Sequence, residues 1–257
     1  MITLPTVIAI GYAKHALTPG EREYERQRQY ADGLSTYHLI VFTRRSEGFV
    51  PTTDGTFKTH PTNSRNKLLM LYDAYRIGVR LARESAGLCV ITSQDPFEPG
   101  VIGRLVARAT NSVHHIQLHN NFFGASVWRR ESLLNRLRAF VGARLLRSAD
   151  KVRVVSARIR AGLDAADIKP RRITVLPVRV DLGPFLAVGE QRSNHTQQSL
   201  TALFVGRFAP EKQLSILLRA VALLRERNIF TTLRLVGDGP ERLRLEQLAQ
   251  ELHLVDQ

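Results

Sequence analysis

Short apolar runs alternate with longer helical segments along the whole chain, and this alternation constrains the fold more than any other feature. Runs of strand length and β-forming composition occur at residues 6–10, 37–42, 88–92, 113–118, 151–155, 173–177, 203–205 and 233–236. Segments of helical character separate them, among them residues 21–30, 68–84, 101–109, 128–148 and 214–227. Strands that alternate with helices predict parallel sheets covered by helices on both faces, so the expected fold class is α/β.

The domain organisation follows from a change in composition near residue 181. Residues 1–182 hold enough strands and helices for one complete parallel-sheet domain. Residues 183–199 are rich in Gly, Pro, Ser, Asn and Gln without periodicity, which is typical of a linker. Residues 200–257 then supply the opening β-α-β-α of a second domain. We expect Asn63 or Ser64 to cap the helix over 68–84, and Ser156 to cap a short later helix.

The net charge of +14 is the strongest compositional signal. Such a chain attracts nucleic acid, anionic lipid or phosphorylated substrates, and the charge alone does not choose among them. The single cysteine, Cys89, excludes an internal disulfide and a thiolate zinc cluster. The N-terminus lacks the basic and small-residue regions of a signal peptide, and no apolar run is long enough to span a bilayer. We expect a cytoplasmic protein.

A candidate anion site follows the apolar run at residues 203–205. The run breaks at Gly206, Arg207 follows at once, Lys212 lies in the next loop, and a helix begins near Leu214. A strand, a glycine turn and a helix N-terminus together favour anion binding. Arginine adds a planar fork of donors and lysine a point charge, which both suit a diphosphate. The alternative is that Arg207 and Lys212 are surface residues of an ordinary βα unit.

Several motifs, in this order and spacing, resemble those of the family 4 retaining glycosyltransferases. In the C-terminal part they are Phe204-Val205-Gly206-Arg207, Pro210-Glu211-Lys212 and Leu235-Val236-Gly237-Asp238-Gly239-Pro240. Upstream, the same family is resembled by Val154-Val155-Ser156 and Ile173-Thr174-Val175-Leu176-Pro177. A bacterial branch that acts in surface-polysaccharide synthesis is resembled by Thr92-Ser93-Gln94-Asp95-Pro96-Phe97-Glu98, Gln117-Leu118-His119 and Pro61-Thr62-Asn63-Ser64. The resemblance covers essentially the whole chain. It implies the GT-B fold, with two Rossmann-like domains and a nucleotide sugar bound between them.

The resemblance also implies roles for individual residues. Arg207 and Lys212 would pair with the diphosphate of the donor, and Gly206 would let the backbone approach the phosphates. His119 would lie near the donor sugar, where an imidazole can bond a hydroxyl or the leaving phosphate. Gly237 would lie near the nucleotide, although turn chemistry alone explains the glycines and the proline of its loop, with Pro240 starting the next helix.

Asp95 has two interpretations, because it can contact the acceptor or simply open a turn as Asp-Pro sequences do. The remaining expectations concern ligands. The donor is a nucleotide-diphosphate sugar and the acceptor a saccharide or a lipid-linked saccharide. No cofactor and no metal are expected, and no nucleic acid partner, because the arginines are spread through helices without interleaved aromatic residues.

The sequence departs from the family pattern in two places. The loop after the first strand, Gly11-Tyr12-Ala13-Lys14-His15, has one glycine where many family members have several. The sequence ends at Gln257, before the further βα units and the pair of glutamates that the resemblance implies. We therefore expect an incomplete gene product or fragment that transfers sugar poorly by itself.

Residues 128–147 predict a basic amphipathic helix with Trp128 near its start. Such a helix can lie on an anionic bilayer at the inner face of the cytoplasmic membrane, or pack on its own sheet with the arginines in solvent. Two rival functions also stay open. One is a non-catalytic basic binding protein or remnant, and the other is a nucleotide-sugar epimerase of the same fold.

Overall fold

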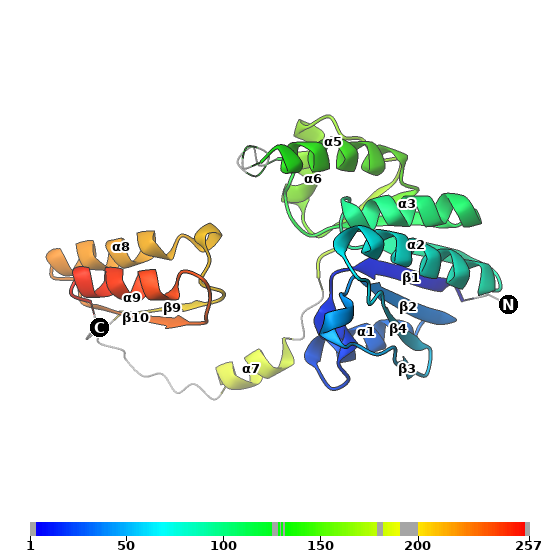
Figure 1. Cartoon of the computed structure of the whole chain (residues 1–257). Helices are drawn as coiled ribbons and strands as arrows, with labels where there is room; N and C mark the ends of the chain where they lie inside the picture. Colours follow the sequence, from blue (N-terminus) through cyan, green and yellow to red (C-terminus); the bar gives the residue numbers. More distant parts are fainter. Residues whose placement is uncertain are drawn as a thin grey trace. The chain divides into compact units, whose positions relative to one another are not determined.

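The computed structural model describes residues 4–124, 128, 130, 132–178, 182–190 and 200–254. The chain divides into two compact units, Met1–Arg179 and Val180–Gln257 (Figure 1). Each has strands alternating with helices, so the predicted α/β class is confirmed. The segment predicted as a linker over 183–199 contains a helix, α7 (Gly183–Glu190), which the sequence did not suggest. Pro184 falls in its first turn, where a missing N–H removes no helical hydrogen bond.

The first unit is built on an eight-stranded sheet of order β3-β4-β2-β1-β5-β6-β7-β8. All neighbours are parallel except β3 and β4. The strands are β1 (Thr6–Gly11), β2 (Thr36–Val41), β3 (Thr53–Asp54), β4 (Phe57–Pro61), β5 (Cys89–Ser93), β6 (Val113–Leu118), β7 (Lys151–Val154) and β8 (Ile173–Val175). The segment before Pro61 therefore supplies two short strands, β3 and β4.

Helices cover both faces of this sheet, which explains why its central strands are apolar throughout. They are η1 (Lys14–Leu17), α1 (Arg22–Ala31), η2 (Arg45–Glu47), α2 (Lys67–Glu84), α3 (Glu98–Thr110), α5 (Leu133–Ser148) and α6 (Ala157–Ala165). Along β1, Ile8 and Ile10 pack in the cluster under α2 and α3, whereas Ala9 faces the cluster under α1. Figure 1 shows α2 and α3 on one face and α1 on the other. Ile116 and Leu146 centre a third cluster beside β6 and α5.

Two helix starts differ from the predictions. The cap of α2 is Asn66, whose side chain accepts a hydrogen bond from the Leu69 N–H at 2.9 Å. The prediction of Asn63 or Ser64 is wrong, because Asn63 has a left-handed φ of 47° and donates instead to the Phe49 carbonyl. The described helix α5 begins at Leu133 and not at 128, since Ser132 caps it by accepting from the Asn135 N–H at 3.1 Å. The predicted cap at Ser156 is confirmed at 3.3 Å.

The second unit has the predicted β-α-β-α order. Its elements after α7 are β9 (Leu200–Val205), η3 (Pro210–Lys212), α8 (Leu214–Glu226), β10 (Thr231–Val236) and α9 (Arg242–Glu251). The two strands are parallel, and α8 and α9 pack against one face of them around Leu218 and Leu245. On the other face Leu203, Val205 and Val236 are more than half exposed.

Candidate functional site

The turn after β9 is held against the turn after β10 by backbone hydrogen bonds. Gly206 N–H donates to the Val236 carbonyl at 2.9 Å, and Phe208 N–H to the Asp238 carbonyl at 2.8 Å. In return, Glu241 N–H donates to the Phe208 carbonyl at 3.1 Å. Because Phe208 is also buried in the core of this unit, the backbone on both sides of Arg207 is fixed. The anion site predicted from the sequence therefore lies on a rigid support.

Glycines at 237 and 239 make this close approach possible. Their φ angles are 153° and 158°, in the region that favours glycine. A Cβ at Gly237 would lie 1.9 Å from the Gly206 carbonyl oxygen, and one at Gly239 would lie 2.3 Å from the Phe208 carbonyl oxygen. Steric need thus accounts for both glycines. Pro240 does not start the next helix as predicted, because α9 begins two residues later, at Arg242.

Arg207 and Lys212 both extend into solvent from this support. Within the described part of the chain neither side chain makes an ion pair or a hydrogen bond, so both keep their full donor capacity for a ligand. Lys212 ends the 3-10 turn η3, immediately before Gln213 and the first turn of α8. The structure therefore places the two predicted cations on one βα connection, as the sequence suggested.

Most backbone N–H groups of this connection are already used. Those of Gly206 and Phe208 donate across the two turns, and those of Ala209, Lys212 and Gln213 donate within the connection itself. The turn itself therefore has few N–H groups left for an anion. The first turn of α8 still leaves N–H groups without helical partners, because that is true of any helix start. An anion at this connection would therefore bind through the side chains and this helix N-terminus.

Asp95 follows β5 at the carboxyl edge of the large sheet. Its Oδ1 accepts a hydrogen bond from the Phe97 N–H at 2.8 Å, so it does open the turn before α3. Burial raises the pKa of its carboxyl to about 6, against the opposing effect of that hydrogen bond, and the charge of Glu98 raises it further. Both interpretations of Asp95 thus stay compatible with the structure, because a turn residue with a perturbed pKa can also serve a site.

His119 directly follows β6, which pairs in parallel with β5. Parallel strands end at the same edge of a sheet, so Asp95 and His119 lie on one edge of the first unit. Burial of part of the ring lowers the pKa of His119, and the positive charge of Arg153 lowers it further. The imidazole is therefore neutral near pH 7 and can donate and accept one hydrogen bond each. Two further histidines, His114 and His115, lie within β6 itself. His114 is fully buried, and the His115 ring forms a hydrogen bond with the Thr92 hydroxyl, as expected of histidines that stabilise the sheet.

Tyr12 and Gln94 belong to the same edge, and neither was singled out from the sequence. The Tyr12 N–H donates to Gln94 Oε1 at 3.2 Å. A Cβ at Gly11 would lie 1.9 Å from that oxygen, so the single glycine of this loop makes room for Gln94. Burial raises the pKa of the Tyr12 phenol to about 12, with Glu98 and Asp95 adding to it. The position of Gly11 after β1 was the one sequence signal for this contact.

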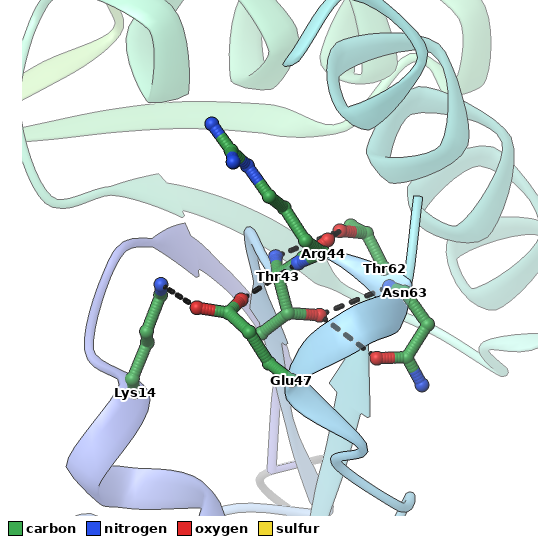
Figure 2. A network of polar contacts seen from close by, with 6 residues as sticks. All are labelled: Lys14, Thr43, Arg44, Glu47, Thr62 and Asn63. Carbon is green, nitrogen blue, oxygen red and sulfur yellow. Dashed lines mark hydrogen bonds and ion pairs between the residues drawn. The ribbon is translucent and has the colours of Figure 1, made fainter. Parts of the chain in front are cut away.

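Three further loops at this edge are joined by polar contacts (Figure 2). Glu47 pairs with the Lys14 ammonium through one carboxylate oxygen and accepts the Arg44 N–H at 2.7 Å through the other. This links the loop after β1 to the loop after β2. In Figure 2 the Arg44 side chain points away from the rest of the network, and within the described residues it has no carboxylate partner.

The loop after β4 joins the same network through Thr62 and Asn63. The Thr43 N–H donates to Thr62 Oγ1 at 2.9 Å, and that hydroxyl donates back to the Thr43 carbonyl at 3.0 Å. The Asn63 N–H donates to Thr43 Oγ1 at 2.9 Å. These contacts hold the ends of β2 and β4 as one rigid platform beside β1, on the edge that carries Asp95 and His119.

The described residues contain neither a cluster of metal ligands nor a membrane-spanning helix. Among the described residues, no three His, Cys, Asp or Glu side chains come together as metal ligands would. Within the same residues, no helix has both the length and the apolar character that crossing a bilayer requires.

Two known domain families account for most of the sequence. The glycosyl transferase 4-like domain matches residues 11–179. The chain belongs to this glycosyltransferase family. The domain called glycosyl transferases group 1 matches residues 189–257, which contain Arg207 and Lys212.

Two curated relatives match part of this glycosyltransferase chain. An uncharacterized glycosyltransferase of Bacillus subtilis, YqgM, is 35% identical over 115 residues, which are 44% of this chain and 30% of YqgM. An uncharacterized glycosyltransferase of Methanocaldococcus jannaschii, MJ1178, is 26% identical over 184 residues, which are 72% of this chain and 46% of MJ1178. The matched regions thus span less than half the length of either relative.

Solved structures share the fold over nearly the whole chain. Sucrose-phosphate synthase from Thermosynechococcus elongatus superposes with a TM-score of 0.70 at 21% identity, covering 98% of this chain and 69% of that one. A trehalose-6-phosphate protein of E. coli, bound with UDP-2-fluoro glucose, gives 0.63 at 11%, covering 96% and 70%. The UDP-N-acetylglucosamine 2-epimerase of Rickettsia bellii gives 0.51 at 10%, covering 98% and 67%. The predicted GT-B fold is confirmed, and because an epimerase shares it, fold alone does not separate transfer from epimerisation.

Proposed function

We propose that this chain acts in a retaining glycosyltransferase that moves a sugar from a nucleotide-diphosphate donor to a saccharide or lipid-linked acceptor. We propose that this transfer takes place in the cytoplasm and is a step in the synthesis of cell-surface polysaccharide. The observation that carries the proposal is the pair Arg207 and Lys212, two exposed cations on a rigid βα connection that have no partner among the described residues. The nucleotide sugar in the related E. coli structure supports this class of donor.

The chemistry asked of Arg207 and Lys212 is electrostatic. Breaking the bond between the sugar and the diphosphate leaves negative charge on the phosphate oxygens. A guanidinium fork and an ammonium can stabilise that charge by charge-assisted hydrogen bonds, and the N-terminus of α8 adds its partial positive charge. The proposal needs no metal and no cofactor, since side chains alone supply the positive charge.

Roles for the remaining site residues follow from their positions and protonation. We assign His119 to a hydrogen bond with a sugar hydroxyl or the leaving phosphate, because its lowered pKa keeps the ring neutral. Asp95 is assigned to the acceptor, since with a pKa of about 6 its carboxylate is mostly ionised at pH 7 and can accept from a hydroxyl. Gly237 lets the two turns pack closely beside the nucleotide, and Gly206 is assigned to the close approach of the backbone to the phosphates.

Calorimetric titration with nucleoside diphosphates tests the donor site. We expect UDP, GDP or ADP to bind, and Arg207→Ala and Lys212→Ala each to weaken binding by about 10- to 100-fold, because one charge-assisted hydrogen bond contributes about 1.5–3 kcal/mol. The matched control is Arg219→Ala, which removes an exposed arginine from α8 in the same unit. Unchanged affinity in both variants would remove the two residues from the site.

Product analysis separates transfer from epimerisation. A transferase releases the nucleoside diphosphate together with a lengthened acceptor. Release of free 2-epimerised sugar without an acceptor product would instead favour the epimerase, and binding without turnover would favour a non-catalytic protein.

We also propose that α5 lies on the anionic inner face of the cytoplasmic membrane, where lipid-linked acceptors reside. Leu133 and Leu137 are exposed on this helix, with Arg136 and Arg144 beside them. Exposed leucines with flanking arginines suit an anionic bilayer. Co-sedimentation with liposomes, with and without anionic lipid, tests this. Absence of binding at low salt would overturn it.

A further inference from the structure

The N-terminal half of helix α5 exposes its large apolar side chains, Leu133, Leu134, Leu137 and Phe140. Leu133 is 79% exposed, and Leu137 and Phe140 are each 58% exposed. The residues turned to the core are Ala139 and Gly142, together with Leu146. An ordinary amphipathic helix on a sheet does the reverse, because burial of leucine and phenylalanine supplies most of its packing energy. The outer face of α5 is therefore built for an apolar partner.

A cavity of about 470 Å³ opens beside this face. Its apolar walls come from Phe123, Phe140 and Ile168, and its cations are Arg130, Arg136 and Arg147. The volume lies in the range of small-molecule sites, about 300–1,000 Å³. Arg144 sits 4.6 Å from the centre of the Phe140 ring and so supports that wall from outside.

Two of the three arginines at the cavity lack an acidic partner among the described residues, and the third, Arg147, has the Asp167 carboxylate in its neighbourhood. In the described part of the chain, Arg130 and Arg136 have no carboxylate partner, and no acidic residue lines the cavity. Arg147 donates one N–H to the Asp167 carbonyl at 3.0 Å, which orients its guanidinium and leaves its other donors. Guanidinium groups bind phosphate through paired hydrogen bonds. A ligand that fits both halves of the cavity carries a phosphate and an apolar chain.

We propose that this cavity binds one anionic phospholipid. Its phosphate lies on Arg136 and Arg147, and the first carbons of its acyl chains lie against Phe123, Phe140 and Ile168. This deepens the membrane association proposed above and rests on it, since Leu133 and Leu137 would enter the same leaflet. Adsorption to a bilayer needs only a surface with both charged and apolar side chains. A lipid site in the cavity also binds a single lipid molecule with one-to-one stoichiometry.

Calorimetry with dihexanoyl phosphatidate, kept below its micelle concentration, tests the site without a membrane. We expect one lipid per chain. Arg136→Gln with Arg147→Gln should weaken binding at least 10-fold through lost phosphate contacts, and Ala143→Phe should weaken it by filling the cavity. Arg108→Gln with Arg219→Gln, which removes the same number of positive charges from exposed positions on α3 and α8, should leave the affinity unchanged. Matching thermal unfolding of all variants excludes misfolding.

The outcomes separate this inference from the membrane proposal. If liposomes bind the chain and monomeric phosphatidate does not, the cavity is no lipid site and surface adsorption stands. If phosphatidate binds and liposomes do not, the cavity takes a phosphorylated apolar ligand away from membranes, and the membrane proposal falls together with the phospholipid assignment that rests on it. Equal binding by inorganic phosphate would show a simple anion site and overturn the lipid assignment. Equal loss in Arg108→Gln with Arg219→Gln would show an effect of net charge and overturn it as well.

Discussion

At the scale of single residues, the turn after β10 cannot tolerate a side chain at position 237, because a Cβ there would collide with the Gly206 carbonyl oxygen of the turn after β9. Gly237 faces the Gly206 carbonyl across the two turns, and Arg207 directly follows Gly206 in the sequence. Any Cβ there forces the turns apart and moves Arg207. The glycine in this loop is thus tied to the donor site through geometry, whether or not it touches the nucleotide.

Gly237→Ala should destabilise the second unit by about 1–3 kcal/mol, because alanine is strained at a φ of 153° and its Cβ meets a backbone oxygen. Nucleoside diphosphate affinity should fall as well. Urea denaturation and calorimetry measure the two effects. Gly33→Ala is the control, since nothing lies within 4 Å of a Cβ at that position. Equal stability of Gly237→Ala and wild type would contradict the proposed steric role.

At the scale of elements, the apolar runs predicted the strands well because both faces of the sheet are covered. Ile8, Ala9 and Ile10 are all buried, so the run needs no alternation. The first residue of helix α2 was harder to predict. Asn63, Ser64 and Asn66 are all good caps, and the choice among them depends on contacts from distant segments, such as that of Asn63 with Phe49.

Among the candidate site residues, those marked by local sequence were predicted, and those defined by contacts with distant segments were not. Arg207, Asp95 and His119 lie just after strand ends and Lys212 lies just before a helix, where local sequence already marks them. Gln94 was missed because its partner, the Tyr12 N–H, is 82 residues away in sequence. The network around Thr43 was missed for the same reason, since no local pattern pairs the ends of β2 and β4.

Loss of the Asn66 cap should weaken α2 measurably. Asn66→Ala removes the acceptor for the Leu69 N–H and should lower the free energy of unfolding by about 0.5–2 kcal/mol. Asn66→Asp keeps an acceptor at the cap and should restore most of that loss. Chemical denaturation of the three proteins provides the measurement. An equal loss in Asn66→Asp would mean that the cap hydrogen bond is not the cause.

At the scale of the whole molecule, histidines within the large sheet make stability depend on pH. Burial lowers the pKa of His38, His60, His114 and His115 to about 4 in each case. Each ring titrates near 6.5 when unfolded, so the unfolded chain binds more protons below that pH. Stability is therefore full above pH 6.5 and falls as the pH drops toward 4. Asp95, with a raised pKa, opposes this between about pH 6 and 4, but as a single group.

Urea midpoints between pH 7.5 and 4.5 should show this decline. For a fully buried ring such as His114, a shift from 6.5 to about 4 corresponds to roughly 3 kcal/mol once the pH reaches 4. His115→Gln, which can still bond Thr92, should flatten the pH dependence by up to one proton. His15→Gln, at an exposed position, is the control. A pH-independent midpoint in the wild-type protein would refute the burial of neutral rings.

The exposed apolar side chains on the β9–β10 sheet have a practical consequence for binding and unfolding measurements. Among the described residues, Leu203, Val205 and Val236 form an exposed apolar strip, and such a strip favours contact between copies. Protein concentration therefore becomes an experimental variable: affinities and unfolding midpoints have to be collected over a dilution series, and the values that count are those that no longer change on further dilution.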